Sequence, residues 1–198
     1  MKLDIKRMTV LLVLMVLIPP AHAAGPEWTL DPSHSGIFFE IDHIYSATRG
    51  YFENFNAKVI FTPDNLGGSS FDFEVEVKSI NTGNSKRDGH LQTEEFFGAK
   101  NFPVMTFKSA AIKKVEDGQY VVEGTMTIKD VSKNLSVPFT FYGVKPHPFD
   151  EKSEVAGFEA RMTIDRLKYN VGSGKYYEMG TIGKDVDVLI SFEATRKK

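Results

Sequence analysis

The sequence contains no cysteine among its 198 residues and only one tryptophan. Without cysteine the protein has no disulfides, thiol nucleophiles or cysteine-ligated metals, so the hydrophobic core alone must hold the fold. Neither charge is in large excess, with 24 basic against 26 acidic side chains. Because binding to a phosphate backbone needs clustered Lys and Arg, nucleic acid is not expected as a partner.

The N-terminal segment has the three-part pattern of a secretory signal peptide. Three basic residues precede a mostly apolar stretch at 8–18, and Ala21-His22-Ala23 follows as a cleavage site. We expect export to the periplasm, cleavage after Ala23, and a mature chain of residues 24–198 without an integral membrane span. An uncleaved anchor is the alternative, which is disfavoured because a spanning helix needs about 20 apolar residues.

Phenylalanine is plentiful, with 16 residues beside 7 tyrosines. Most of the mature chain alternates apolar and polar residues with a period of two, as half-buried β-strands do. Because the connections are mostly short and no repeat or linker is visible, we predict one all-β domain, either an antiparallel sandwich or a closed barrel. The eight main segments are residues 35–43, 55–61, 71–78, 105–107, 122–128, 135–141, 156–164 and 186–194.

An exported chain with this pattern could also be an outer-membrane barrel, because alternation alone does not say which face points inward. Three features favour an apolar interior. Asp72, Glu74 and Glu76 would crowd like charge into an eight-stranded lumen, no aromatic girdles are visible at the strand ends, and the chain ends in basic residues. The interior would then hold Phe39, Phe55, Phe61, Phe71, Phe73, Phe107, Phe139, Phe141, Phe158 and Phe192.

Eight strands is the size at which a barrel interior is either filled by side chains or holds one small ligand. The many inward phenylalanines favour a filled barrel. Small residues expected on the same face leave room for a ligand. These are Ala57, Gly124, Ala156, Gly157 and Ala160. The residues alone therefore leave both alternatives open.

Residues 87–107 interrupt the alternating pattern. Thr93 can cap a short helix, Gly98 can end it, and Pro103 returns the chain to a strand. We expect a short helical insert at about 85–98 that acts as a plug or lid on the barrel. The Gly-rich segment 170–184 is expected to border the same opening.

Several spaced motifs resemble the YceI-like family. They are Trp28-x-Leu30-Asp31-Pro32-x-His34-Ser35, Gly50-x-Phe52-x-x-Phe55, Arg87-Asp88-x-His90-Leu91, Phe102-Pro103-x-Met105-x-Phe107, and Asp165-Arg166 followed by Asn170-Val171-Gly172. The resemblance extends over residues 27–194 and implies an eight-stranded antiparallel lipocalin-like barrel in the periplasm. It also implies a hydrophobic pocket for a polyisoprenoid or another long-chain amphiphile, and a link to stress response. The Gly-x-Trp signature of true lipocalins is absent, so the similarity to lipocalins is architectural.

Thirteen inward residues are the candidate ligand contacts in such a pocket. They are Phe39, Ile41, Phe55, Phe73, Val75, Phe107, Met126, Phe139, Phe141, Phe158, Met162, Ile190 and Phe192. A polar head group at the mouth needs donors, because an unpaired buried polar group costs about 1–3 kcal/mol. Arg49, Arg87, His90 and Arg166 are the candidate donors. The alternative is structural: Arg87 and His90, with Asp88, brace the insert against the barrel rim, and Arg166 braces the chain together with Asp165.

Neither a metal, a cofactor nor catalysis is expected. The mature chain has four histidines, but none has the close spacing of a ligand pair, and there is no Gly-x-Ser-x-Gly nucleophile motif. We therefore expect a binding or carrier protein. One alternative is an enzyme acting on an isoprenoid or quinone precursor, with His43, Asp88 or His90 as acid or base. Another is a filled barrel that acts through protein partners. A homodimer is possible on the flat outer faces.

Overall fold

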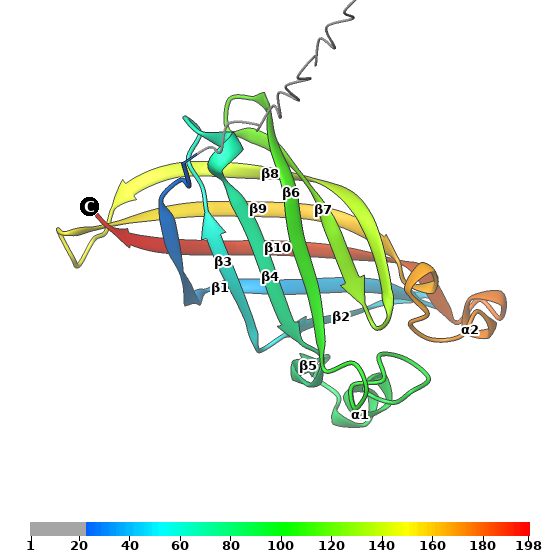
Figure 1. Ribbon diagram of the computed structural model, residues 1–198. Helices are drawn as coiled ribbons and strands as arrows, with labels where there is room; N and C mark the ends of the chain where they lie inside the picture. Colours follow the sequence, from blue (N-terminus) through cyan, green and yellow to red (C-terminus); the bar gives the residue numbers. More distant parts are fainter. Residues whose placement is uncertain (1–22) are drawn as a thin grey trace, which may run out of the picture.

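The structure is a computed structural model that describes residues 23–198 (Figure 1). The expected signal peptide lies outside this range apart from Ala23. The strands are β1 (Glu27–His43), β2 (Ser46–Phe52), β3 (Phe55–Ile60), β4 (Ser70–Glu76), β5 (Ile80–Asn81), β6 (Val104–Glu116), β7 (Gln119–Ile128), β8 (Val131–Pro146), β9 (Ser153–Asp165) and β10 (Ile182–Lys197). The helices are α1 (Ser85–Leu91), α2 (Lys175–Glu178) and the short 3-10 turns η1 (Leu66–Gly68), η2 (Val77–Ser79) and η3 (Arg166–Tyr169).

Eight of these strands close into an antiparallel barrel, as the sequence predicted. The order β10-β9-β8-β7-β6-β4-β3-β1 becomes a ring because β1 also pairs with β10. On its other edge, β1 pairs with β3 over Glu27–Thr29 and with β2 over Ile37–His43. Strands β2 and β5 thus extend the sheet beyond the ring at one end. Closure leaves the eight ring strands with few unpaired backbone groups.

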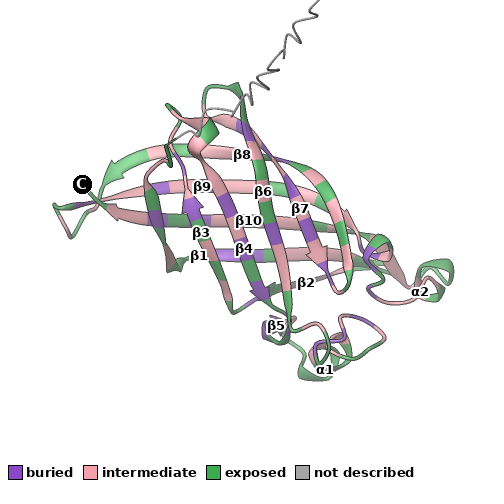
Figure 2. Ribbon diagram, viewed as in Figure 1, coloured by how far each residue is buried: buried purple, intermediate pink, exposed green. Residues whose placement is uncertain are grey.

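The apolar face of each strand points into the barrel. Burial alternates residue by residue along β7, where Val122, Met126 and Ile128 are buried (Figure 2). The same alternation buries Phe71 and Phe73 on β4. The period-two pattern therefore predicted the inward face correctly, with one exception among the small residues. Gly157 lies between the inward-facing Ala156 and Phe158 and therefore faces outward. A Cβ atom added there would lie 3.5 Å from the Cβ of the exposed Tyr142.

Strand β2 was not expected, because Ser46–Gly50 is small and polar. It forms because the long strand β1 continues past β3 and offers a free edge, along which Ile41 pairs with Thr48. Tertiary context thus overrides weak local propensity. A two-residue turn of Ile44 and Tyr45 joins the two strands.

The helical insert lies where it was expected, but its cap was assigned to the wrong residue. The side chain of Asn84 accepts a hydrogen bond from the Arg87 backbone N–H at 3.1 Å and begins α1. Thr93 follows the helix, and its hydroxyl donates to the carbonyl of His90. Asn and Thr are both favourable N-caps, so local sequence could not choose between them. The chain returns to β6 at Val104, directly after the expected proline.

One half of the barrel interior is filled by aromatic rings. Phe61 is 1% exposed and stands at the centre of this cluster. Its ring centroid lies 5.0–5.8 Å from those of Phe71, Tyr120, Phe139, Phe141 and Phe158. Trp28 donates its indole N–H to the Phe61 carbonyl at 2.9 Å, which satisfies a buried donor. This aromatic half closes the barrel at the end away from α1 and α2.

Candidate ligand-binding cavity

The other half of the barrel encloses a cavity of about 800 Å³. Phe71, Phe139 and Phe158 form its floor, where it meets the aromatic half. Its walls are mostly apolar, both aliphatic and aromatic, and it extends outward to the α1 insert and to Met179 beside α2, which is 70% exposed. Its volume lies in the range of about 300–1,000 Å³ typical of small-molecule pockets. The barrel is therefore part filled and part open.

The structure places eleven of the thirteen expected contact residues on the cavity wall. The two exceptions are Phe55 and Phe141. Phe141 belongs to the aromatic half, with its ring 5.0 Å from that of Phe61, and Phe55 packs beside the small cluster around Phe52. Alternation gives the face of a strand on which a residue lies but not its position along the barrel axis, which explains why these two residues lie away from the cavity. Ligand contact by the other eleven remains a prediction.

Further wall residues fall into two groups that sequence reasoning had missed. The first lies on strands in the inward phase, so the period-two pattern could have found it. It includes Ile37, Val122, Ile128, Val137, Ile164, Val186 and Val188. The second comes from the α1 insert and the α2 segment, which have no regular period. It includes Leu91, Phe96, Phe97, Val171, Tyr176 and Met179.

Glu95 joins the insert to the α2 segment at the cavity mouth. Its carboxylate contacts His90 Nε2 at 2.9 Å, accepts a hydrogen bond from the Tyr176 hydroxyl at 2.9 Å, and lies 3.4 Å from Lys175 Nζ. These contacts lower the pKa of Glu95 to about 2, and the hydrogen bond with His90 contributes most. The Phe96 ring also stacks on Tyr176, with centroids 5.9 Å apart. Two segments distant in sequence are thereby held together over the opening.

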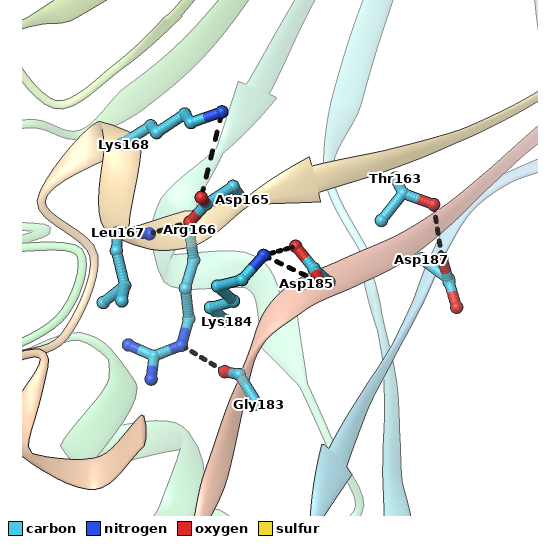
Figure 3. Close-up of polar contacts among 9 residues, drawn as sticks. All are labelled: Thr163, Asp165, Arg166, Leu167, Lys168, Gly183, Lys184, Asp185 and Asp187. Carbon is cyan, nitrogen blue, oxygen red and sulfur yellow. Dashed lines mark hydrogen bonds and ion pairs between the residues drawn. The ribbon is translucent and has the colours of Figure 1, made fainter. Parts of the chain in front are cut away.

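Arg166 is buried at the wall of the cavity, with 4% of its surface exposed. Its Nε donates to the Gly183 carbonyl at 2.7 Å (Figure 3) and its Nη1 to the Val171 carbonyl at 2.8 Å. Within residues 23–198 no carboxylate forms an ion pair with it, although the neighbouring Asp165 caps η3 through the Leu167 N–H. Burial lowers the pKa of the Arg166 guanidinium. The side chain braces the loop and also leaves a buried positive charge without a contacting carboxylate.

The other three candidate donors also line the cavity, but each already has a partner. Arg49 pairs with Glu40 across the β1–β2 hairpin. Arg87 donates to both oxygens of Thr82, at 2.7 and 2.8 Å, which ties α1 to the end of β5. His90 contacts Glu95 as described above. These contacts favour bracing as the main role of all three.

One cluster of potential metal ligands is present in the described part of the chain, far from the mouth. Side-chain ligand atoms of Asp31, His34 and Glu193 lie within 4.8 Å of one another. His34 Nδ1 is 2.8 Å from Asp31 Oδ2, and this hydrogen bond raises the pKa of His34 and lowers that of Asp31. Since the side chain of His34 is 66% exposed and is already hydrogen-bonded to Asp31, the cluster gives no positive evidence for a metal.

Among residues 23–198, no helix has the length and apolar character that crossing a membrane requires.

Comparison with known proteins identifies the family. A model of the YceI-like domain matches residues 28–194. The chain belongs to this family. Protein YceI of Salmonella arizonae is 27% identical over 186 residues, which cover 92% of this chain and 94% of that protein. Among solved structures, BcnA of Burkholderia cenocepacia superimposes with a TM-score of 0.74 at 25% identity, covering 83% of this chain and 99% of BcnA.

A more distant structure shares the fold. It is a domain from Saccharophagus degradans, described as polyisoprenoid binding and implicated in plant cell wall breakdown. The TM-score is 0.62 at 13% identity, and the match covers 84% of this chain and 97% of that domain. The YceI-like barrel inferred from the sequence motifs is thus confirmed at the level of family and fold.

Proposed function

We propose that this protein binds and carries a polyisoprenoid or another long-chain amphiphile in the periplasm. The observation that carries the proposal is the apolar cavity of about 800 Å³ that runs from the aromatic floor to the α1 and α2 segments. Burial of apolar area supplies the affinity, at about 25 cal/mol per Å². The family membership and the polyisoprenoid-binding description of the S. degradans domain support this ligand class.

The ligand would enter with its apolar chain first. The floor of the cavity is aromatic, whereas its polar side chains, Arg87, His90 and Arg166 among them, lie toward the insert and the η3–α2 loop. A polar head left at that end would retain hydrogen-bond partners and access to water, which avoids the cost of burying it unpaired. Because apolar contact is not directional, the cavity should accept several chains of suitable length.

The test is a chain-length series on delipidated protein. Isoprenoid alcohols of increasing length are titrated, and equilibrium binding is measured by native mass spectrometry. We expect affinity to rise with each added unit until the cavity is full and then to level off. Affinity that does not depend on chain length, or the absence of any complex, would contradict the proposal.

Binding rather than catalysis is the role proposed for the mouth residues. Asp88 accepts hydrogen bonds from the Thr82 backbone N–H and hydroxyl, at 2.9 and 2.6 Å, which assigns it to bracing. The variants Asp88→Ala and His90→Ala separate the two roles. Loss of turnover of an isoprenoid or quinone precursor, with ligand binding retained, would establish the enzymatic alternative.

A homodimer also remains a proposal. Phe38 and Tyr51 are exposed side by side on the outer face, with ring centroids 6.3 Å apart. Leu189 lies beside Phe38 in register on β10. Sedimentation of the wild type against Phe38→Ser tests this surface, and a mass that stays monomeric at all concentrations would rule out the dimer.

A further inference from the structure

Large apolar side chains are exposed around the cavity mouth. Ile44 and Tyr45 form the tip of the β1–β2 hairpin and are 57% and 101% exposed. Tyr177 and Met179, in and just after α2, are 47% and 70% exposed. We call these four residues the mouth rim. Water-exposed apolar side chains in such a group indicate an interaction site more strongly than scattered ones do.

Hydrogen bonds and strand pairing hold the two parts of the mouth rim together. The Ile44 backbone N–H donates to the Thr181 carbonyl at 3.2 Å, and His43 pairs with Ile182. The residues on both sides of the hairpin tip, His43 and Ser46, line the cavity, as do Thr181 and Ile182. The mouth rim therefore borders the opening through which a ligand would pass.

The backbone at Ile44 is unfavourable for the residue that occupies it. Its φ is +51°, a left-handed conformation that β-branched side chains rarely adopt. Glycine is the usual residue at the first position of a two-residue hairpin turn with positive φ. Packing does not explain isoleucine here, because its side chain is mostly exposed. A strained apolar residue at an exposed tip is consistent with a role in binding.

We propose that the mouth rim docks on the surface of a phospholipid bilayer, so that a ligand passes between membrane and cavity without crossing water. This inference rests on the proposed lipid-binding function. Tyrosine is enriched where proteins meet the membrane interface, because its ring is apolar and its hydroxyl stays hydrated.

The charges beside the mouth rim are mixed, with Lys175 and Lys184 close in sequence to Glu178 and Asp185. Docking should therefore depend on apolar insertion, should not require anionic lipid and should persist in high salt.

The first test uses a fluorescent reporter at each end of the barrel. The native Trp28 is buried, so a tryptophan introduced by Tyr45→Trp would dominate quenching by brominated phosphatidylcholine vesicles. Phe149→Trp is the matched control. Phe149 is 93% exposed in the β8–β9 loop, at the opposite end of β9 and β10 from α2 (Figure 1). We expect quenching for Tyr45→Trp alone. Equal quenching at both ends, or none at either, would overturn the proposal.

The second test removes apolar surface from the mouth rim. Ile44→Gly and Tyr45→Ser should each weaken partitioning onto phosphatidylcholine vesicles about ten- to hundredfold, whereas Phe149→Ser should leave it unchanged. Ile44→Gly also relieves the backbone strain, so this variant should unfold at a temperature no lower than the wild type. Reduced partitioning therefore cannot be attributed to loss of folding. If both mouth-rim variants partitioned onto vesicles as strongly as the wild type, the proposal would be overturned.

Binding of an isoprenoid alcohol delivered in solution, without vesicles, is measured on the same proteins. Wild-type protein that binds this alcohol but not vesicles would contradict docking and leave the carrier function standing. Wild-type protein that binds vesicles but not the alcohol would contradict the carrier function on which the proposal rests.

Discussion

The two halves of this barrel are built from the same strands but differ in what fills them. In the aromatic half, rings around Phe61 pack against one another and leave no room for a ligand. In the cavity half, aliphatic side chains such as Met162 and Val188 stand among further phenylalanines, and an open space remains between them. The comparison teaches that an eight-stranded barrel can be both filled and hollow, with the aromatic half acting as a rigid floor for the cavity.

The largest expected difference between the halves comes from truncating a phenylalanine in each. Phe61→Ala should lower the free energy of unfolding by about 3–5 kcal/mol, because it leaves a cavity among five rings. Phe39→Ala removes the same atoms from the cavity wall and should cost about 1–2 kcal/mol, since that ring already borders empty space. Urea denaturation of both variants measures the difference. Equal losses would show that the halves are packed alike.

Filling the interior provides the opposite test. Ala156 and Ala160 lie on the same strand and the same face, but only Ala160 lines the cavity, and Ala156 is 0% exposed. Ala156→Phe should destabilise the protein by about 1–3 kcal/mol through overpacking. Ala160→Phe should cost less than about 1 kcal/mol, because a ring can enter the open space, but should reduce ligand binding. A loss of stability in Ala160→Phe as large as that in Ala156→Phe would argue against an open cavity.

The smallest expected effect is the loss of folding stability at low pH, to which one carboxylate at each end of the barrel contributes. The pKa of Glu95 is lowered from its ordinary value of 4.5 to about 2, mainly by His90. Its contribution to stability is therefore present above about pH 4.5 and is lost as the pH falls through about 2. Glu95→Gln should flatten that part of the stability profile and should also speed ligand release, because it weakens the contact between insert and α2.

Asp150, in the β8–β9 loop at the far end, is the control for that variant. Lys197 lowers the pKa of Asp150 as well, so Asp150→Asn should also reduce the loss of stability in acid. It should leave ligand release unchanged, because this loop does not border the cavity. The rate of ligand release is measured by exchange with labelled ligand. Equal rates in Glu95→Gln and Asp150→Asn would show that Glu95 does not hold the mouth closed.

The sequence predicted the strands and their inward faces because both follow a period of two that local residues dictate. That pattern left sandwich and barrel open, and the choice of a barrel came from the resemblance to the YceI-like family. The position of each inward-facing side chain along the barrel axis was not predictable in the same way. Phe141 and Phe139 share a face, but only Phe139 lines the cavity, and this depends on how distant strands are staggered. Strand β2 was not predictable because it depends on the free edge of β1, which only the folded chain provides. The cap at Asn84 was not predictable because Asn and Thr are almost equally favourable N-caps. The mouth residues Phe96 and Tyr176 meet only in the folded chain.

Native mass spectrometry of protein recovered from its bacterial host without detergent tests the central claim most directly. The wild type and Ala160→Phe are compared, and bound molecules are extracted into organic solvent and identified. We expect a stoichiometric long-chain adduct on the wild type and a reduced or absent adduct on the folded variant. A wild-type protein that is free of ligand and stays free after incubation with polyprenyl phosphates, quinones and fatty amides would contradict the account.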